Sequence, residues 1–182
     1  MRIISGTLGG RKFYPDKLTA TRPTTDFAKT ALFNILNNYF DFQEVSFLDL
    51  FSGTGSISFE FASRGSSRIV AVENDERCIA FIKKRIEEWK IEAIDLIKSD
   101  VFRFLNSAHE KFDVIFAGPP YALENIPSLA EKVFEQNLLK EDGWFILETD
   151  PHYSFETHPN FFRKTNYGQT NFHFFKQKVL SS

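Results

Sequence analysis

The amino-acid sequence predicts an α/β protein in which a central, mostly parallel sheet of seven strands carries helices on both faces. Short apolar runs, which are typical of strands buried on both sides, alternate along the chain with segments of helical periodicity. Such alternation indicates a parallel sheet, because each helix returns the chain to the edge where the previous strand began. Two later apolar runs, 161–166 and 170–175, are joined only by Tyr167-Gly168-Gln169, which predicts a closing antiparallel pair.

The remaining elements follow in order from the same two patterns. The chain is expected to open with a β-hairpin whose arms, 2–6 and 11–14, flank a glycine turn at Leu8-Gly9-Gly10. A polar stretch from Thr21 to Asp26 is rich in helix-capping residues and precedes the first helix. The expected helices are 27–39, 57–62, 75–90, 101–108 and a last one that begins near Pro127 and ends near residue 138. The other expected strands are 45–51, 68–73, 91–97, 112–117 and 143–148.

Length and composition limit the class of protein. The 182 residues suggest a single domain, 1–182, with the hairpin region 1–20 as a small extension. The chain is 42% hydrophobic, and we interpret its 22 phenylalanines as core residues rather than as base-stacking platforms. One cysteine rules out an internal disulfide, and the four histidines show no ligand spacing, so no metal is expected. No apolar run has the length of a membrane span or signal sequence, so we expect a cytoplasmic monomer without membrane contact.

The stretch 45–56 carries the strongest functional signal. A buried strand breaks at Ser52-Gly53-Thr54-Gly55, and helical spacing resumes directly afterwards. Glycines allow a tight turn and the close approach of a ligand to the main chain, while the new helix offers unpaired N–H groups. Ser58 stands where a dinucleotide-binding pattern would have its third glycine, which argues against a nicotinamide dinucleotide. A plain strand-to-helix turn without a ligand is the alternative.

Polar or glycine-rich features end four of the expected parallel strands. They are 49–55, Glu73, Asp100 and 118–121. Glu73 follows the glycine turn by about twenty residues, the distance at which an acidic side chain binds ribose hydroxyls. Because ligands of open α/β sheets bind outside the carboxyl ends of the strands, we expect all four features to share one edge and one cleft. A solvated strand end is the alternative for Glu73.

This arrangement resembles the Rossmann-like class I methyltransferases, which use S-adenosylmethionine. More closely, nearly the whole chain resembles the RsmD-type enzymes, the bacterial family that methylates the N2 amine of one guanine in 16S rRNA. The N-terminal hairpin and the Arg-Pro-Thr-Thr-Asp stretch are the specific part of the likeness, because the glycine turn and Pro-Pro-Tyr alone would fit many amino-methyltransferases. The matching stretches are 1–6, 22–26, 49–55, 119–121 and 167–170.

The resemblance implies which residues hold S-adenosylmethionine. Asp49 and the backbone of Gly53-Thr54-Gly55 would bind the methionine end, with the carboxylate accepting from its ammonium group. Glu73 would accept from both ribose hydroxyls, Asp100 would accept from the adenine amino group, and Val101 would pack on the ring. The full implied set is Asp49, Phe51, Gly53, Thr54, Gly55, Glu73, Asn74, Asp100 and Val101.

The resemblance also implies a catalytic set formed by Gly118, Pro119, Pro120 and Tyr121. The prolines would leave carbonyls facing the pocket, and Tyr121 would offer a flat face to an extruded base. Tyr121 as a cap on the core is the alternative. The methyl group would pass directly to the amine, so the resemblance implies neither a covalent enzyme intermediate nor a metal.

Gly118 departs from the family motif, which begins with Asp or Asn at this position. Three consequences are open. Asp26, Thr24 or a water could supply the missing hydrogen-bond acceptor, which is the reading we favour because the rest of the site is intact. Activity could instead be lower by about 100-fold, as when one preorganised partner is removed. The chain could also bind the cofactor without catalysing transfer.

Basic residues gather near the N-terminus, although the whole chain has a net charge of −2. A locally basic end suits phosphates, and scattered solvated charge explains it equally well. Under the resemblance it becomes the expected contact to 16S rRNA in the 30S subunit, with a strength that falls steeply with salt. The expected substrate-binding residues are Arg2, Arg11, Lys12, Arg22, Thr24 and Asp26.

Other functions share parts of this pattern. An amino-methyltransferase of another substrate, such as adenine N6 in DNA, would have the same glycine turn and Pro-Pro-Tyr. A ribosome-assembly factor that binds the cofactor but is disabled at Gly118 would not be an enzyme. A nicotinamide dehydrogenase is disfavoured because the third glycine and a placed catalytic His or Tyr–Lys pair are missing.

Overall fold

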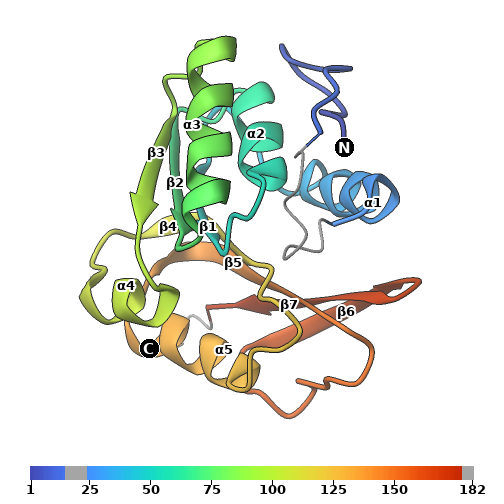
Figure 1. Ribbon diagram of the computed structural model, residues 1–182. Coiled ribbons are helices and arrows are strands. Elements are labelled where there is room, and N and C mark those ends of the chain that lie inside the picture. The colour runs from blue at the N-terminus through green and yellow to red at the C-terminus, as the bar shows by residue number, and fades with distance from the viewer. Residues whose placement is uncertain (15–23, 178–182) are drawn as a thin grey trace.

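The computed structural model describes residues 1–14 and 24–177, and its centre is a seven-stranded sheet with the order β3-β2-β1-β4-β5-β7-β6 (Figure 1). The first five strands in this order run parallel, and β7 and β6 add an antiparallel edge. The strands are β1 (Ser46–Leu50), β2 (Arg68–Glu73), β3 (Ile94–Lys98), β4 (Phe112–Ala117), β5 (Leu139–Thr149), β6 (Phe161–Tyr167) and β7 (Thr170–Lys176). The helices are α1 (Asp26–Leu36), α2 (Ser56–Ser63), α3 (Glu76–Trp89), α4 (Val101–Ser107) and α5 (Ile126–Glu135). The predicted fold class is confirmed.

The register of the parallel strands brings their carboxyl ends together. Leu50 at the end of β1 lies opposite Val72 of β2 and Ala117 of β4. Ala117 in turn lies opposite Leu147 of β5. The loops that follow β1, β2 and β4 and the last residues of β5 therefore meet at one edge of the sheet, as the strand-end pattern predicts.

Helices cover both faces of the sheet, and each face has its own core. Figure 1 shows α1, α2 and α3 on one face and α4 and α5 on the other. Successive strand residues point to opposite faces, so Phe47 of β1 belongs to the first core and its neighbour Leu48 to the second. Most of the largest fully buried side chains are phenylalanines, which confirms their interpretation as core residues.

The two arms of the predicted N-terminal β-hairpin do pair antiparallel, although neither arm is a regular strand. The N–H of Ile3 donates to the Arg11 carbonyl at 2.9 Å, and the N–H of Gly10 donates to the Ile3 carbonyl at 2.8 Å. Ile3 and Phe13 are buried in the core that includes residues of α2 and α3. At Gly6 an added Cβ would lie 1.8 Å from the Ser63 carbonyl oxygen, so this arm lies directly on the end of α2. Residues 15–20 of the predicted extension lie outside the described residues.

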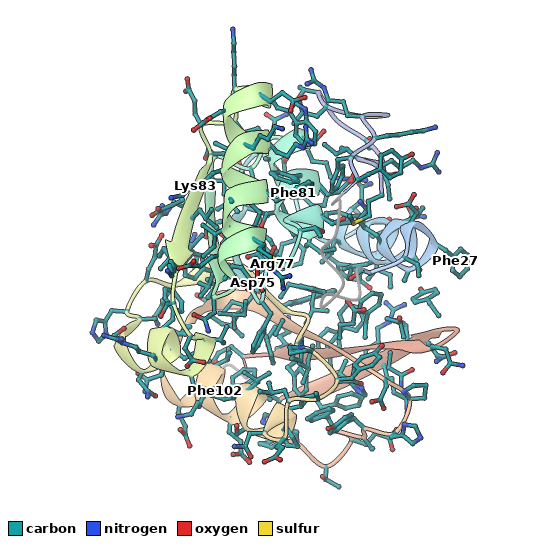
Figure 2. All side chains as sticks on the ribbon, viewed as in Figure 1. Phe27, Asp75, Arg77, Phe81, Lys83 and Phe102 are labelled. Atoms are coloured by element: carbon teal, nitrogen blue, oxygen red, sulfur yellow. The ribbon has the colours of Figure 1, made fainter. Side chains whose placement is uncertain are left out.

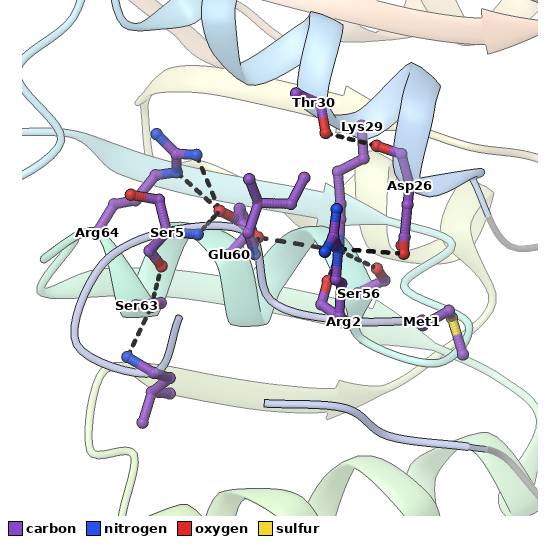
Figure 3. A network of polar contacts seen from close by, with 12 residues as sticks. Met1, Arg2, Ser5, Asp26, Lys29, Thr30, Ser56, Glu60, Ser63 and Arg64 are labelled. Atoms are coloured by element: carbon purple, nitrogen blue, oxygen red, sulfur yellow. Dashed lines mark hydrogen bonds and ion pairs between the residues drawn. The ribbon is translucent and has the colours of Figure 1, made fainter. Parts of the chain in front are cut away.

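A buried carboxylate on α2 holds the first arm in place. Glu60 accepts from the backbone N–H groups of Ile4 at 2.8 Å and Ser5 at 3.1 Å, so these donors are not directed to the opposite arm. The same carboxylate pairs with Lys29 of α1 at 3.8 Å and with Arg64 at 2.9 Å (Figure 3). Two cations and two amide donors satisfy the buried charge and fasten the arm to α1 and α2.

Several predicted boundaries move by a few residues. Helix α1 ends at Leu36 instead of 39, and Phe27, which lies outward on it, is 71% exposed (Figure 2). Strand β3 begins at Ile94 instead of 91, because Lys90 adopts a left-handed conformation and the N–H of Ile91 bonds back to the Ile86 carbonyl. This closing turn keeps residue 91 at the end of α3.

Candidate active-site cleft

A cleft of about 870 Å³ lies at the carboxyl ends of the central parallel strands. Its volume is in the range of small-molecule sites. The walls contain eight of the nine residues predicted to bind the cofactor and all four predicted catalytic positions. The lining residues from these predictions are Asp49, Phe51, Gly53, Thr54, Glu73, Asn74, Asp100, Val101, Gly118, Pro119, Pro120 and Tyr121. The two predicted sets thus share one cleft.

The glycine turn is tight, as its sequence predicts, and three of its residues have positive φ values. Phe51, Gly53 and Gly55 have φ values of 64°, 55° and 75°, in the region that glycine adopts without steric cost. Gly55 is the predicted cofactor residue that does not line the cleft. A Cβ there would lie 2.9 Å from the Phe59 ring and 3.1 Å from Ile82, so this glycine serves the packing of α2.

Glu73 closes the glycine turn onto the end of β2. Its Oε2 accepts from the N–H of Gly53 at 2.6 Å, and its Oε1 accepts from the N–H groups of Asn74 at 2.8 Å and Asp75 at 2.9 Å. Glu73 and the glycine turn, which are about twenty residues apart in sequence, are therefore in direct contact. A solvated strand end does not describe this side chain.

Asp49 is buried beneath the centre of the cleft. Its side chain is 1% exposed, and Oδ2 accepts from the Ser58 hydroxyl at 2.5 Å. Burial raises the pKa of Asp49 to about 7, the Ser58 hydrogen bond lowers it, and the negative charges of Glu73 and Glu148 raise it further. A desolvated carboxylate that lines a cleft is a group that a cationic ligand would stabilise in its charged form.

Asp100 and Val101 follow β3 and begin α4. Asp100 is the N-cap of this helix, with Oδ1 accepting from the N–H of Arg103 at 2.9 Å. Val101 is 3% exposed, and both residues line the cleft on the side of Asn74. The cap holds one Asp100 oxygen against the helix end and fixes the direction of the carboxylate.

The Pro-Pro-Tyr segment forms the opposite wall. The N–H of Gly118 donates to the Leu50 carbonyl at 3.3 Å, which ties the end of β4 to the end of β1. Tyr121 is 36% exposed, and its hydroxyl lies 3.4 Å from the Gln169 carbonyl in the turn between β6 and β7. Tyr121 therefore does not cap the core.

Two buried polar residues complete this wall, and only Thr24 was predicted from the sequence. Thr24, a predicted substrate residue, donates its hydroxyl to Glu148 Oε2 at 2.5 Å. Glu148 stands near the end of β5, is 8% exposed, and lines the cleft. An acid at the carboxyl end of the fifth parallel strand was visible in the sequence, and the strand-end argument applied there would have found it.

The other predicted substrate residues lie elsewhere. Asp26 does not line the cleft and pairs with Arg2 at 3.6 Å, so the expectation that it replaces the missing acceptor is not supported. Residues 1–14 together form the N-terminal arm. Arg11 and Lys12 are exposed on it, and the Arg11 guanidinium lies 5.8 Å from the centre of the Trp89 ring. Arg22 lies outside the described residues.

The described residues contain neither a metal-binding cluster nor a membrane-spanning helix. No cluster of three or more His, Cys, Asp or Glu side chains in ranges 1–14 and 24–177 is placed to bind a metal ion. None of the helices in those ranges is long and apolar enough to cross a bilayer.

Comparison with known proteins places the chain among methyltransferase relatives. The model of the family described as Conserved hypothetical protein 95 matches residues 1–176. YlbH of Bacillus subtilis is 34% identical over 82% of this chain and 83% of its own length. The ribosomal RNA small subunit methyltransferase D of Haemophilus influenzae is 32% identical over 82% of this chain and 79% of its own.

A solved structure shows the same fold with ligands bound. The 16S rRNA N2 G1207 methyltransferase of Thermus thermophilus, in complex with AdoMet and guanosine, superimposes with a TM-score of 0.70. The match covers 87% of this chain and 45% of that one, at 20% sequence identity, and so concerns the fold alone.

Proposed function

The chain belongs to the family described as Conserved hypothetical protein 95, and on that premise we propose that it transfers a methyl group from S-adenosylmethionine to the N2 amine of a guanine in 16S rRNA. The relative in Haemophilus influenzae is named for methyl transfer to small-subunit ribosomal RNA. The observation that carries the proposal is the single cleft, whose one wall suits the cofactor and whose other wall suits a base.

The cofactor wall offers partners for the ammonium, the ribose and the adenine of S-adenosylmethionine, which supplies an electrophilic sulfonium methyl group when bound. The Asp49 carboxylate accepts from the ammonium of the methionine end, and this contact offsets the cost of burying the charged carboxylate. Glu73 accepts from ribose hydroxyls beside the turn it already holds. Asp100 accepts from the adenine amino group, and Val101 packs against the ring.

The opposite wall positions the nucleophile. The Pro119 carbonyl accepts from the guanine amine, and Tyr121 presents an aromatic face on which an extruded base stacks. Because the amine itself attacks the methyl group, these residues act by holding the base in line and by accepting hydrogen bonds as positive charge develops on nitrogen.

The RNA contact is proposed for the N-terminal arm. Arg2, Arg11 and Lys12 project from one short exposed segment, and the Glu60 network holds that segment in a fixed position beside α1. Fixed cations attract the phosphate backbone without reading its sequence.

A transfer assay tests the proposal. We expect the purified protein to move labelled methyl from S-adenosylmethionine to 30S subunits taken from a strain that lacks its family enzyme, and primer extension on the 16S rRNA to stop at one guanine. Duplex DNA serves as the competing substrate, and labelling of adenine there would replace the proposal by a DNA methyltransferase. Cofactor binding without transfer to either substrate would indicate an assembly factor instead.

A further inference from the structure

Gly118 leaves the target amine without the side-chain acceptor that the family motif supplies, and Glu148 lies beside the gap. The register of β4 and β5 ends with the pair Ala117 and Leu147, and Gly118 and Glu148 are the residues that follow them along the chain. A Cβ built on Gly118 would lie 3.6 Å from Glu148 Oε2. That separation is ordinary van der Waals contact, so the Glu148 oxygen borders the space that any side chain at position 118 would enter.

The surroundings of Glu148 fix its carboxylate toward the cleft. Thr24 donates to Oε2 at 2.5 Å and, like Glu148, lines the cleft. The charge of Glu148 contributes to the raised pKa of Asp49, which places both carboxylates within electrostatic reach across the same space. An ionised carboxylate accepts several hydrogen bonds at once, so its contact with Thr24 is compatible with accepting from a base as well.

The chemistry of a carboxylate also selects among bases. The Watson–Crick edge of guanine presents two neighbouring donors, the N1–H and the N2 amine, which match the two oxygens of a carboxylate. Adenine presents one amine beside the lone pair of N1, so one carboxylate oxygen would face an acceptor. A mismatched acceptor pair of this kind is strongly disfavoured in a buried site.

From this geometry we infer that Glu148 replaces the missing motif side chain and accepts from the target guanine, selecting it over adenine. The inference rests on the proposed function, because it names the group that orients the amine in the same cleft. It is a substrate-binding role carried by the end of β5 instead of the end of β4.

Substitutions at positions 148 and 118 test this together. Glu148→Gln keeps the side-chain size, and Glu148→Ala removes the acceptor. Each is expected to lower kcat for 30S subunits by about 100-fold and to leave the dissociation constant of S-adenosylmethionine within about twofold of the original, since the cofactor wall is untouched. Glu156→Gln changes an exposed glutamate on the loop after β5 and is the matched control, with unchanged kcat.

Rescue separates an acceptor from a structural role. Gly118→Asn restores an acceptor near the same point, and its backbone is not in the left-handed region. In the Glu148→Ala background it should recover kcat by about tenfold or more. In the original protein Gly118→Asp should lower kcat, because it sets a second negative charge against Glu148, whose Oε2 lies 3.6 Å from the position of the new Cβ.

A binding measurement provides a readout that does not depend on transfer. Calorimetry with guanosine 5′-monophosphate and with inosine 5′-monophosphate, which lacks the N2 amine, should show a preference for guanosine of about tenfold. Glu148→Gln should abolish that preference. If the original protein transfers methyl groups but Glu148→Gln retains both kcat and the preference, the inference is wrong and the proposed function stands. If transfer is absent while the preference depends on Glu148, the inference stands without the proposed function; if both are absent, both fall.

Discussion

The two halves of the cleft are held together in different ways. In the cofactor half, each acidic side chain bonds to the backbone of its own strand-to-helix unit. Asp100 caps α4 through the N–H of Arg103, and Glu73 accepts from the N–H groups of the two residues that follow it. Of the contacts made by these two acids, the one from Glu73 to Gly53 reaches a neighbouring unit. These contacts form wherever the local strand, turn and helix form.

The base half depends on contacts between distant parts of the chain. Thr24 and Glu148 are 124 residues apart in sequence, and the Tyr121 hydroxyl meets the carbonyl of Gln169, which is 48 residues away. The half therefore exists only once α1, β4, β5 and the turn after β6 have all packed. The contrast teaches that cofactor binding and base positioning should respond separately to substitution, except at residues that lie under both halves.

Asp49 lies under both halves, and it should give the largest effect. Its folded pKa of about 7 exceeds the ordinary value of 3.8, so the folded state binds a proton more tightly than the unfolded state. The associated stability is complete below about pH 4 and is lost as pH rises through about 7, by up to about 4 kcal/mol. Asp49→Asn cannot ionise and should escape this loss. In urea unfolding from pH 4 to pH 8, the free energy of unfolding of Asp49→Asn should rise relative to that of the original protein.

Two comparisons separate the effect of Asp49 from other causes. Burial lowers the pKa of His173 to about 4, which favours the folded state as pH rises from 4 to 6.5 and opposes the Asp49 effect. His173 is present in both proteins, so the difference between them isolates residue 49. At pH 8 the variant should also bind S-adenosylmethionine more weakly, because an amide does not attract its ammonium as a carboxylate does. If the stability of the two proteins depends equally on pH, the buried charge of Asp49 does not affect the free energy of unfolding.

Lys29 ties the N-terminal arm and α1 to the start of α2, and its loss should have the next largest effect. Its ammonium donates to the Arg2 carbonyl at 2.6 Å and to the Ser56 hydroxyl at 3.0 Å, and it pairs with Glu60, so it connects the arm, α1 and the start of α2 (Figure 3). Lys29→Met should lower the free energy of unfolding by about 3 kcal/mol, because it strips one cation from a buried carboxylate. Lys164→Met at an exposed pair should change it by less than about 1 kcal/mol. A loss as small as that control would mean that Arg64 alone satisfies Glu60.

The same contrast explains which parts of the molecule could be predicted from the sequence. The glycine turn, Glu73 and Asp100 are encoded by neighbouring residues, so strand-end position and spacing were enough to identify them. The fold class could be predicted for the same reason, because the hydrophobic periodicity of each strand and helix is visible in its own residues. Gly55 shows the limit even here, since its glycine serves Phe59 and not the cleft.

The base half could not be assembled from the sequence. Nothing near Thr24 indicates that it meets Glu148, because the contact is created by the pairing of β4 with β5 and by the position of α1. Asp26, two residues from Thr24, was an equally good candidate for the cleft in the sequence, but in the structure it pairs with Arg2. The hairpin pairing could be predicted, but its attachment to α2 could not, since Glu60 lies more than fifty residues from the Ile4 and Ser5 N–H groups that it binds. Contacts of long sequence separation decided each of these cases.

Glu73 tests whether the cofactor half is locally built, with a smaller expected effect. Glu73→Gln replaces an acceptor of three N–H bonds by an amide that must turn its own donors toward some of them. We expect binding of S-adenosylmethionine to weaken by about 2 kcal/mol, or roughly 30-fold, in calorimetry. The preference for guanosine over inosine monophosphate should persist, because the base half is separate. Glu92→Gln, on the exposed turn after α3, is the control. Loss of base preference together with cofactor affinity would show that the halves are not independent.

The N-terminal arm lies outside both halves and should give the smallest effect. Arg11→Gln combined with Lys12→Gln removes two exposed cations that no buried acid requires. Affinity for 16S rRNA should fall by about fivefold at moderate salt, and the slope of log affinity against log salt should lessen by about 1.4. Cofactor affinity and base preference should not change. Lys83→Gln with Lys84→Gln removes the same charge from the exposed face of α3 and should leave the slope unaltered (Figure 2). If both pairs alter the slope equally, RNA meets the protein through general attraction, because a directed contact would distinguish the arm from the helix.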